Sequence, residues 1–256
     1  MAAMLLAFAL VSTILAKMIP VIGQFYYWRF SLTPSVIMFS SLLLGPLFGS
    51  LIGAMSDLIP ALVYPTGAPN LFITLVYAIY GALPWLLVRL TKFLKGKKAC
   101  SIVAYALMLV TLLVVCLLLF LTDWVDFAFL GAEAWAKPLL VGVLSLATVG
   151  LMVGLFFTER YYKNKCVEYP DLPSPSEIAI VSYSLEIVVM AFGKSLAFYL
   201  FYFIGSSSQP LPFMTLALML LSIAPINVLL ETFAVNWALV FFKRFNHHYG
   251  SRNING

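Results

Sequence analysis

Two charged side chains, Arg29 and Asp57, interrupt the otherwise apolar stretch between Trp28 and Asn70. An ionisable group inside a membrane costs about 2.5 to 3.5 kcal/mol on insertion scales, so it is usually retained for a substrate, an ion or a partner. For Asp57 we favour a place in the wall of a cavity, the alternative being a structural hydrogen bond that holds the following loop. Because Pro60 leaves the carbonyl of a preceding residue without its helical donor, we expect the helix that carries Asp57 to finish as an irregular, polar segment near the outer face.

Aromatic residues precede Arg29 directly, and they include Tyr27 and Trp28. Arginine is a forked donor suited to carboxylate or phosphate, and aromatic faces stack on flat rings, so the segment could close over a ligand. It could equally be an interfacial belt, because tyrosine, tryptophan and arginine gather at headgroup level. The sequence does not separate these two interpretations.

Further polar residues occur in the last two apolar segments. Glu186 and Lys194 stand on the first of these, and Asn227, Glu231 and Asn236 stand on the second. At about 1.5 Å per residue, Lys194 falls near the middle of the membrane, and the two glutamates lie closer to the cytoplasm. Lys194 is therefore expected to face the bundle, where it would neutralise Asp57 or meet an anionic substrate.

Motifs for enzymatic chemistry do not occur in the chain. Neither H-E-x-x-H nor G-x-S-x-G is present, and Gly193-Lys194-Ser195 lacks the first glycine of a phosphate-binding loop. Cys100, Cys116 and Cys166 are isolated, and the adjacent His247 and His248 are expected to be solvated. We therefore predict no enzyme, no cofactor and no metal site.

Composition places these residues in an integral membrane protein. Of the 256 residues, 63% are hydrophobic and 10% are charged, and the mean hydropathy is +1.02. The net charge of +5 belongs to no soluble basic domain and does not indicate nucleic-acid binding. We predict an all-α protein with about eight transmembrane helices, at residues 2–19, 34–46, 48–63, 70–90, 100–122, 138–158, 177–204 and 213–242.

The second and third of these spans share one apolar run, which Gly45-Pro46 divides into two short helices. With eight spans, the basic clusters after the fourth, sixth and eighth all fall on one side of the membrane. This side is the cytoplasm by the positive-inside rule. We therefore predict a single polytopic domain over residues 1–256 in the cell membrane, with both termini in the cytoplasm.

Small residues recur four apart along two of the spans. Ala3 and Ala7 form one such pair, and Gly45, Gly49 and Gly53 form a ladder. Such stripes allow close contact between helices in lipid. Packing within the bundle is the favoured interpretation for the glycines, whereas internal packing and a partner surface are about equal for the alanines.

The order of these elements resembles a known family. WRFSLTPSVIMFSSLLLGPLFGSLIGAMSDLIPALVYPTG, followed by NLFITLVYAIYGAL, is similar to the substrate-binding S components of energy-coupling factor (ECF) vitamin transporters, most nearly to their folate-family branch. The resemblance covers residues 1–92 and implies a six-helix core. Residues 100–158 would then be an inserted hairpin, and residues 177–242 would form the C-terminal helical hairpin of that core.

The resemblance implies a subunit of an ABC-type importer that captures a vitamin-like molecule from outside. Its partners would be a transmembrane coupling subunit and two ATPase subunits. Ala3 and Ala7 would face the coupling subunit, and residues 26–30, with Tyr27, Trp28 and Arg29, would gate the pocket. The implied substrate-binding positions are completed by Asp57, Asn70, Thr74, Tyr77, Lys194 and Asn227.

Two other functions remain open at this stage. A proton- or sodium-coupled secondary transporter would need a membrane carboxylate, which Asp57, Glu186 or Glu231 could supply. A membrane scaffold protein without a small-molecule ligand would use the aromatic segment only as a belt.

Overall fold

The computed structural model describes residues 1–18, 31–63, 70–91, 97–121, 136–165, 173–205 and 213–250. Within these ranges every regular element is a helix. The elements are α1 (Ala2–Met18), α2 (Thr33–Leu44), α3 (Pro46–Val63), α4 (Leu71–Thr91), α5 (Lys97–Leu121), α6 (Ala136–Lys165), α7 (Pro175–Leu185), η1 (Glu186–Gly193), α8 (Lys194–Gly205) and α9 (Phe213–Gly250).

Six helical segments of the described chain are long and apolar enough to cross a membrane. They comprise α3, α4, most of α5, α6 and α9, and the continuous segment Pro175–Phe201. The helices α1 and α2 are also apolar but shorter. The chain is thus all-helical and has the character of a multi-pass membrane protein, whereas a total of eight crossings stays a prediction.

The turn expected at Gly45-Pro46 is confirmed. Helix α2 ends at Leu44, Gly45 takes a φ of 92°, and α3 begins at Pro46. Glycine suits this left-handed conformation because it has no Cβ, and proline is accepted in the first helical turn. The expectation that α3 becomes irregular at Pro60 is wrong, because α3 continues through this residue to Val63. Pro60 lies in the final turn, where it leaves the carbonyl four residues earlier without its helical donor, yet the helical backbone continues past it.

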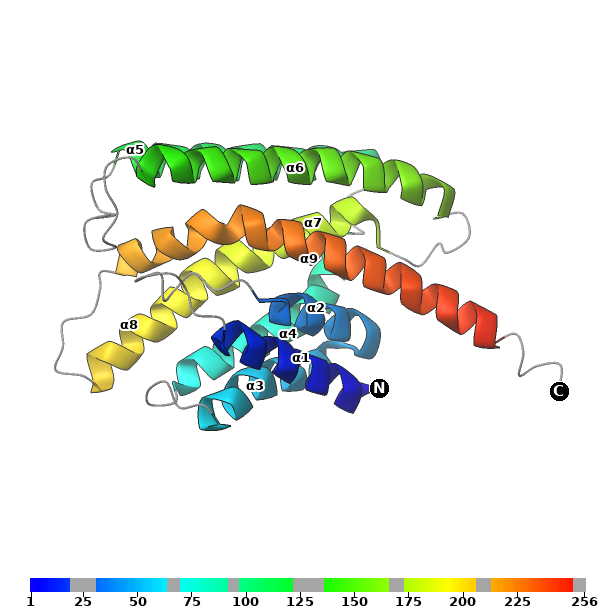
Figure 1. The fold of residues 1–256 in the computed structure, drawn as a ribbon, viewed down its shortest axis with the longest axis horizontal. Helices are drawn as coiled ribbons and strands as arrows, with labels where there is room; N and C mark the ends of the chain where they lie inside the picture. Colours follow the sequence, from blue (N-terminus) through cyan, green and yellow to red (C-terminus); the bar gives the residue numbers. More distant parts are fainter. Residues whose placement is uncertain are drawn as a thin grey trace.

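The helices form three layers (Figure 1). The first contains α1–α4, and the middle one contains α7, η1, α8 and the long α9. The third is the hairpin of α5 and α6, which packs mainly on α7 and α9. The first residues of α1 and the last described residues of α9 lie at the same end of the bundle.

Close contact between α3 and α4 depends on glycine. A Cβ on Gly49 would collide with the carbonyl oxygen of Gly81, and a Cβ on Gly53 would collide with that of Tyr77. These backbone contacts support the interpretation of the glycine ladder as internal packing. They also hold Asp57 of α3 beside α4, within hydrogen-bond distance of Thr74.

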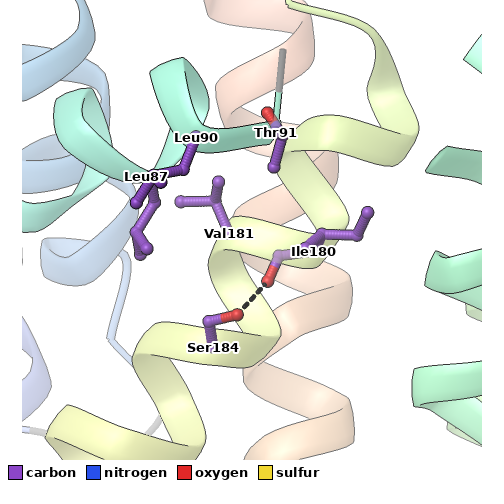
Figure 2. A pocket seen from close by; sticks show the side chains of 6 residues that line it. All are labelled: Leu87, Leu90, Thr91, Ile180, Val181 and Ser184. Atoms are coloured by element: carbon purple, nitrogen blue, oxygen red, sulfur yellow. Dashed lines mark hydrogen bonds between the residues drawn. The ribbon is translucent and has the colours of Figure 1, made fainter. Parts of the chain in front are cut away.

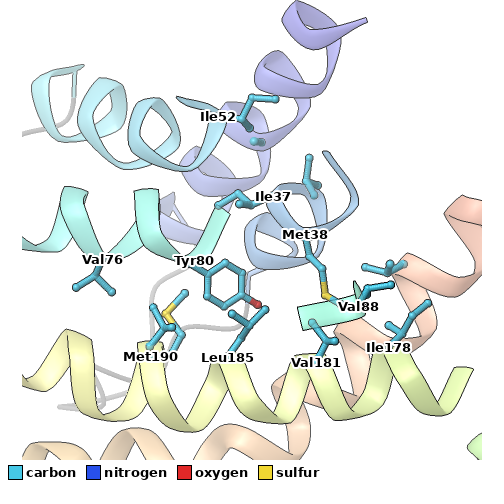
Figure 3. Packing of buried hydrophobic residues seen from close by; sticks show 14 of the residues in the cluster. Ile37, Met38, Ile52, Val76, Tyr80, Val88, Ile178, Val181, Leu185 and Met190 are labelled. Atoms are coloured by element: carbon cyan, nitrogen blue, oxygen red, sulfur yellow. The ribbon is translucent and has the colours of Figure 1, made fainter. Parts of the chain in front are cut away.

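Tyr80 of α4 lies at the centre of the core between the first two layers. It is fully buried, and its ring projects toward Leu185 and Met190 on the neighbouring helix (Figure 3). Ile37 and Met38 of α2 enclose it from the other side. A tyrosine hydroxyl at this depth requires a hydrogen-bond partner, and here it donates to Glu231.

Candidate functional site

One face of α4 carries three of the residues predicted to bind substrate. Asn70, Thr74 and Tyr77 follow the four- and three-residue spacing of a single helical face. Asn70 precedes the helix, where its side-chain oxygen accepts a hydrogen bond from the Phe72 amide. Its side-chain nitrogen donates to the Ala197 carbonyl at 3.4 Å, which connects the start of α4 to α8.

Asp57 meets this face from α3. The Thr74 hydroxyl donates to Asp57 Oδ2 at 2.8 Å, and the carboxyl side chain is half-buried. The contact places a carboxylate between two tightly packed helices rather than toward lipid. The structure thus brings Asp57 and Thr74 together as parts of one polar cluster.

Lys194 completes the cluster from the first position of α8. Its ammonium nitrogen lies 5.8 Å from the centre of the Tyr77 ring, a distance suited to a cation–π interaction. We call Asp57, Asn70, Thr74, Tyr77 and Lys194 the outer cluster. It joins a cation, an aromatic face and hydrogen-bonding groups from three helices.

The outer cluster lies toward one end of the bundle. Helix α4, which starts directly after Asn70, begins at the end opposite the start of α1 and the last described turns of α9 (Figure 1). If both termini are cytoplasmic, as the charge distribution predicts, this end faces outward. Tyr27, Trp28 and Arg29 lie outside the described residues, so their predicted place over the cluster stays a prediction.

Asn227 belongs to a second polar group, deeper in the bundle. Its side-chain nitrogen donates to Glu186 Oε2 at 3.2 Å, and Tyr80 Oη donates to Glu231 Oε1 at 2.8 Å. The two carboxyl groups are close enough to interact electrostatically. We call Glu186 and Glu231 the inner carboxyl pair, and Tyr80 and Asn227 are its hydrogen-bond donors.

Both glutamates are almost completely buried, with exposed fractions of 2% for Glu186 and 1% for Glu231. Glu186 also interacts electrostatically with Lys194, which relates the inner pair to the outer cluster. Sequence reasoning named the glutamates only as possible coupling carboxylates and did not single out Tyr80. The four-residue spacing of Asn227 and Glu231 was the available signal, because it places them on one face of α9.

A π-helical segment, η1, separates the two groups along the chain. Glu186 begins it and Lys194 follows it, with the Lys194 amide donating to the Val189 carbonyl five residues back. Such segments are uncommon and occur frequently at functional sites. The wider turn changes the angle around the helix axis between the Glu186 and Lys194 side chains. The single α-helix predicted over 177–204 does not include this change.

A small apolar pocket occurs elsewhere, between the last turns of α4 and α7. Leu87, Leu90, Thr91, Ile180, Val181 and Ser184 line it (Figure 2). Its volume of about 150 Å³ is below the range usual for ligand pockets, and none of the predicted substrate residues lines it. We therefore do not assign the substrate site to it.

Ala3 and Ala7, predicted to contact a coupling subunit, are both exposed on α1. Ala9, on another face of this helix, is fully buried in the core. The alanine stripe is therefore not used for packing within the described part of the bundle. Its surface is available to lipid or to a second membrane protein.

Comparison with family models, with curated proteins and with solved structures found no match for this chain. The fold and the two polar groups define the class, an all-helical, membrane-type protein with ionisable residues inside its bundle.

Proposed function

We propose that this chain is the substrate-binding subunit of an ECF-type importer and captures a small anionic molecule that carries a flat ring. The observation that carries the proposal is the Lys194 ammonium beside the Tyr77 ring, next to the Asp57–Thr74 hydrogen bond. A cation would pair with a carboxylate or phosphate of the ligand, and the tyrosine face would stack on its ring. Asp57, Asn70 and Thr74 would supply directional hydrogen bonds.

The arrangement of the helices supports this proposal. Without the α5–α6 hairpin, α1–α4, the continuous α7–η1–α8 segment and α9 form a unit of six helices. This is the number that the resemblance implies for the core. The hairpin packs on the outer side of α7 and α9, away from the outer cluster (Figure 1), so it can be an addition that leaves the binding residues in place.

The partners follow from the same proposal. The binding subunit would capture its ligand and would depend on a membrane coupling subunit and two ATPases for release inside the cell. No step of covalent chemistry is required of this chain. The exposed Ala3 and Ala7 would supply a small-residue stripe for the coupling subunit.

A ligand screen tests the binding role directly. We expect one of the water-soluble vitamins that carry both an anionic group and a flat ring, such as folate, to raise the melting temperature of the purified protein in detergent. Lys194→Met should weaken binding of that compound at least about 30-fold, because an interaction with a partly buried charge contributes about 2 kcal/mol or more. Tyr77→Ala should weaken it about tenfold through loss of stacking. Isothermal titration calorimetry measures both effects.

Tyr105→Ala is the matched control for Tyr77→Ala. Tyr105 is also a half-buried membrane tyrosine, but its hydroxyl donates to the Met152 carbonyl within the α5–α6 hairpin. Its replacement should leave the dissociation constant unchanged. If no vitamin shifts the melting temperature, or if both tyrosine variants bind equally well, the outer cluster is not the ligand site.

The inner carboxyl pair favours a second candidate, a secondary transporter driven by protons or sodium ions. Buried membrane carboxylates of this kind occur in ion-coupled carriers. The two functions differ in whether the chain works alone. For the ECF proposal we expect proteoliposomes that contain only this chain to accumulate no radiolabelled ligand, with or without an ion gradient. Accumulation that an ionophore abolishes would establish the secondary transporter instead.

A further inference from the structure

We propose that Glu186 and Glu231 form a proton-binding site, in which the two carboxyl groups share an exchangeable proton at neutral pH. The site is independent of the ligand proposed above. It is built from η1 and α9, with Tyr80 of α4 and Asn227 of α9 as neutral hydrogen-bond donors.

This proposal depends on the surroundings of two carboxyl oxygen atoms. Each carboxyl group has one oxygen that accepts a hydrogen bond, from Asn227 or from Tyr80. The other oxygen of each, Glu186 Oε1 and Glu231 Oε2, is buried and accepts no hydrogen bond from the described chain. The Ser182 hydroxyl, which lies near Glu231, donates to a methionine sulfur instead. An ionised carboxylate oxygen without a partner in an apolar interior is strongly unfavourable. One proton satisfies both atoms, because the protonated carboxyl group donates and its neighbour accepts.

The charges that surround the pair agree with a single added proton. Tyr80 meets the pair from α4 as a hydrogen-bond donor, and Lys194 at the start of α8 interacts electrostatically with Glu186. One positive charge nearby can offset one carboxylate but not two. Two carboxylates in contact cannot both remain ionised at low cost, whereas a pair that shares one proton carries a single negative charge.

A proton fits this site better than a metal ion. Among the residues that the structure describes, no three histidine, cysteine or acidic side chains lie together so that they could hold a metal ion. Tyr80 and Asn227 each direct a donor hydrogen, rather than a lone pair, at the carboxyl groups. Donor hydrogens would repel a cation placed at the same oxygens, but they leave the two unpartnered oxygens free to share a proton.

Infrared spectroscopy of the purified protein tests the proposal without any ligand. At neutral pH we expect the carbonyl stretching band of a protonated carboxyl group, and we expect it to shift in D2O because the proton exchanges. The double variant Glu186→Gln/Glu231→Gln should lose this band, and each glutamine keeps the size of its glutamate and one acceptor oxygen for Tyr80 or Asn227. Glu177→Gln should retain the band, since Glu177 belongs to the capping box at the start of α7, a position that accepts glutamine.

Two results would overturn the proposal. One is a band that persists unchanged in the double variant, because the protonated group would then lie elsewhere. The other is absence of the band from the wild-type protein at neutral pH, which would mean that both carboxyl groups are ionised. Circular dichroism and gel filtration verify that the double variant is folded. If it is not, the single variants are measured, and each should alter the band's position or intensity.

Failure of this experiment is distinguishable from failure of the proposed function. The infrared band depends only on the inner carboxyl pair and is measured without a vitamin. A vitamin that binds through Lys194 and Tyr77 would leave the import proposal standing even if the band were absent. Conversely, a shared proton without any vitamin binding would leave the proton site and favour the secondary transporter.

Discussion

Replacing Gly49 or Gly81 with leucine is expected to force α3 and α4 apart and to destabilise the protein by about 3 kcal/mol or more. The reason is geometric, since a Cβ at either position would collide with the backbone carbonyl of the other glycine. Backbone atoms cannot rotate away as a flexible side chain can. We expect a lower melting temperature in detergent and a smaller monodisperse fraction in gel filtration.

Gly150→Leu provides the control for these variants. Gly150 is an exposed helical glycine of α6, and a Cβ there would meet no atom within 4 Å. The same change of residue should therefore be neutral or slightly stabilising, because leucine is the better helix former. Equal losses for Gly49→Leu and Gly150→Leu would mean that the contact between α3 and α4 is not what makes glycine necessary.

Replacing Ala3 or Ala7 with tryptophan is expected to abolish assembly with a coupling subunit while ligand binding continues. Both alanines are exposed on α1, so a larger side chain should not disturb the core. A large ring would, however, hold a partner helix away from the small-residue surface that close packing in lipid requires. Co-purification with the coupling subunit and its ATPases measures assembly, and the thermal shift measures binding.

Ala106→Trp is the corresponding control on the α5–α6 hairpin. Ala106 is also an exposed alanine of an apolar helix, but it lies on the layer remote from α1 (Figure 1). Assembly should survive this substitution. Co-purification that is unchanged in Ala3→Trp and Ala7→Trp, or lost equally in Ala106→Trp, would remove α1 as the coupling surface.

The sequence alone was sufficient to predict an all-helical membrane-type protein and the position of its helices. Runs of apolar residues long enough to cross a bilayer leave few alternatives to a helix, because its backbone groups are satisfied internally. The turn at Gly45-Pro46 was equally local, since proline lacks an amide hydrogen and glycine tolerates a positive φ. The expected irregular segment at Pro60 was wrong, because α3 accommodates the lost hydrogen bond in its last turn and continues to Val63.

Part of the candidate site could also be anticipated. Asn70, Thr74 and Tyr77 share a helical face by spacing alone, and a lone lysine in an apolar segment has few positions available other than the bundle interior. The contacts between Thr74 and Asp57 and between Lys194 and Tyr77 required the packing of α3 and α8 on α4. Sequence separation gives no measure of such distances.

The sequence by itself determined which residues are ionisable and which segments must be helical, because composition and local periodicity set both. Only the tertiary structure brought together Glu186 and Glu231, which are 45 positions apart in the sequence, and placed the Tyr80 hydroxyl where it donates to Glu231. It also divided the predicted polar residues between an outer cluster and an inner carboxyl pair. The physical reason is that the burial of a side chain and its hydrogen-bond partners depend on how the helices pack. The π-helical segment Glu186–Gly193 also changes which side chains come into contact.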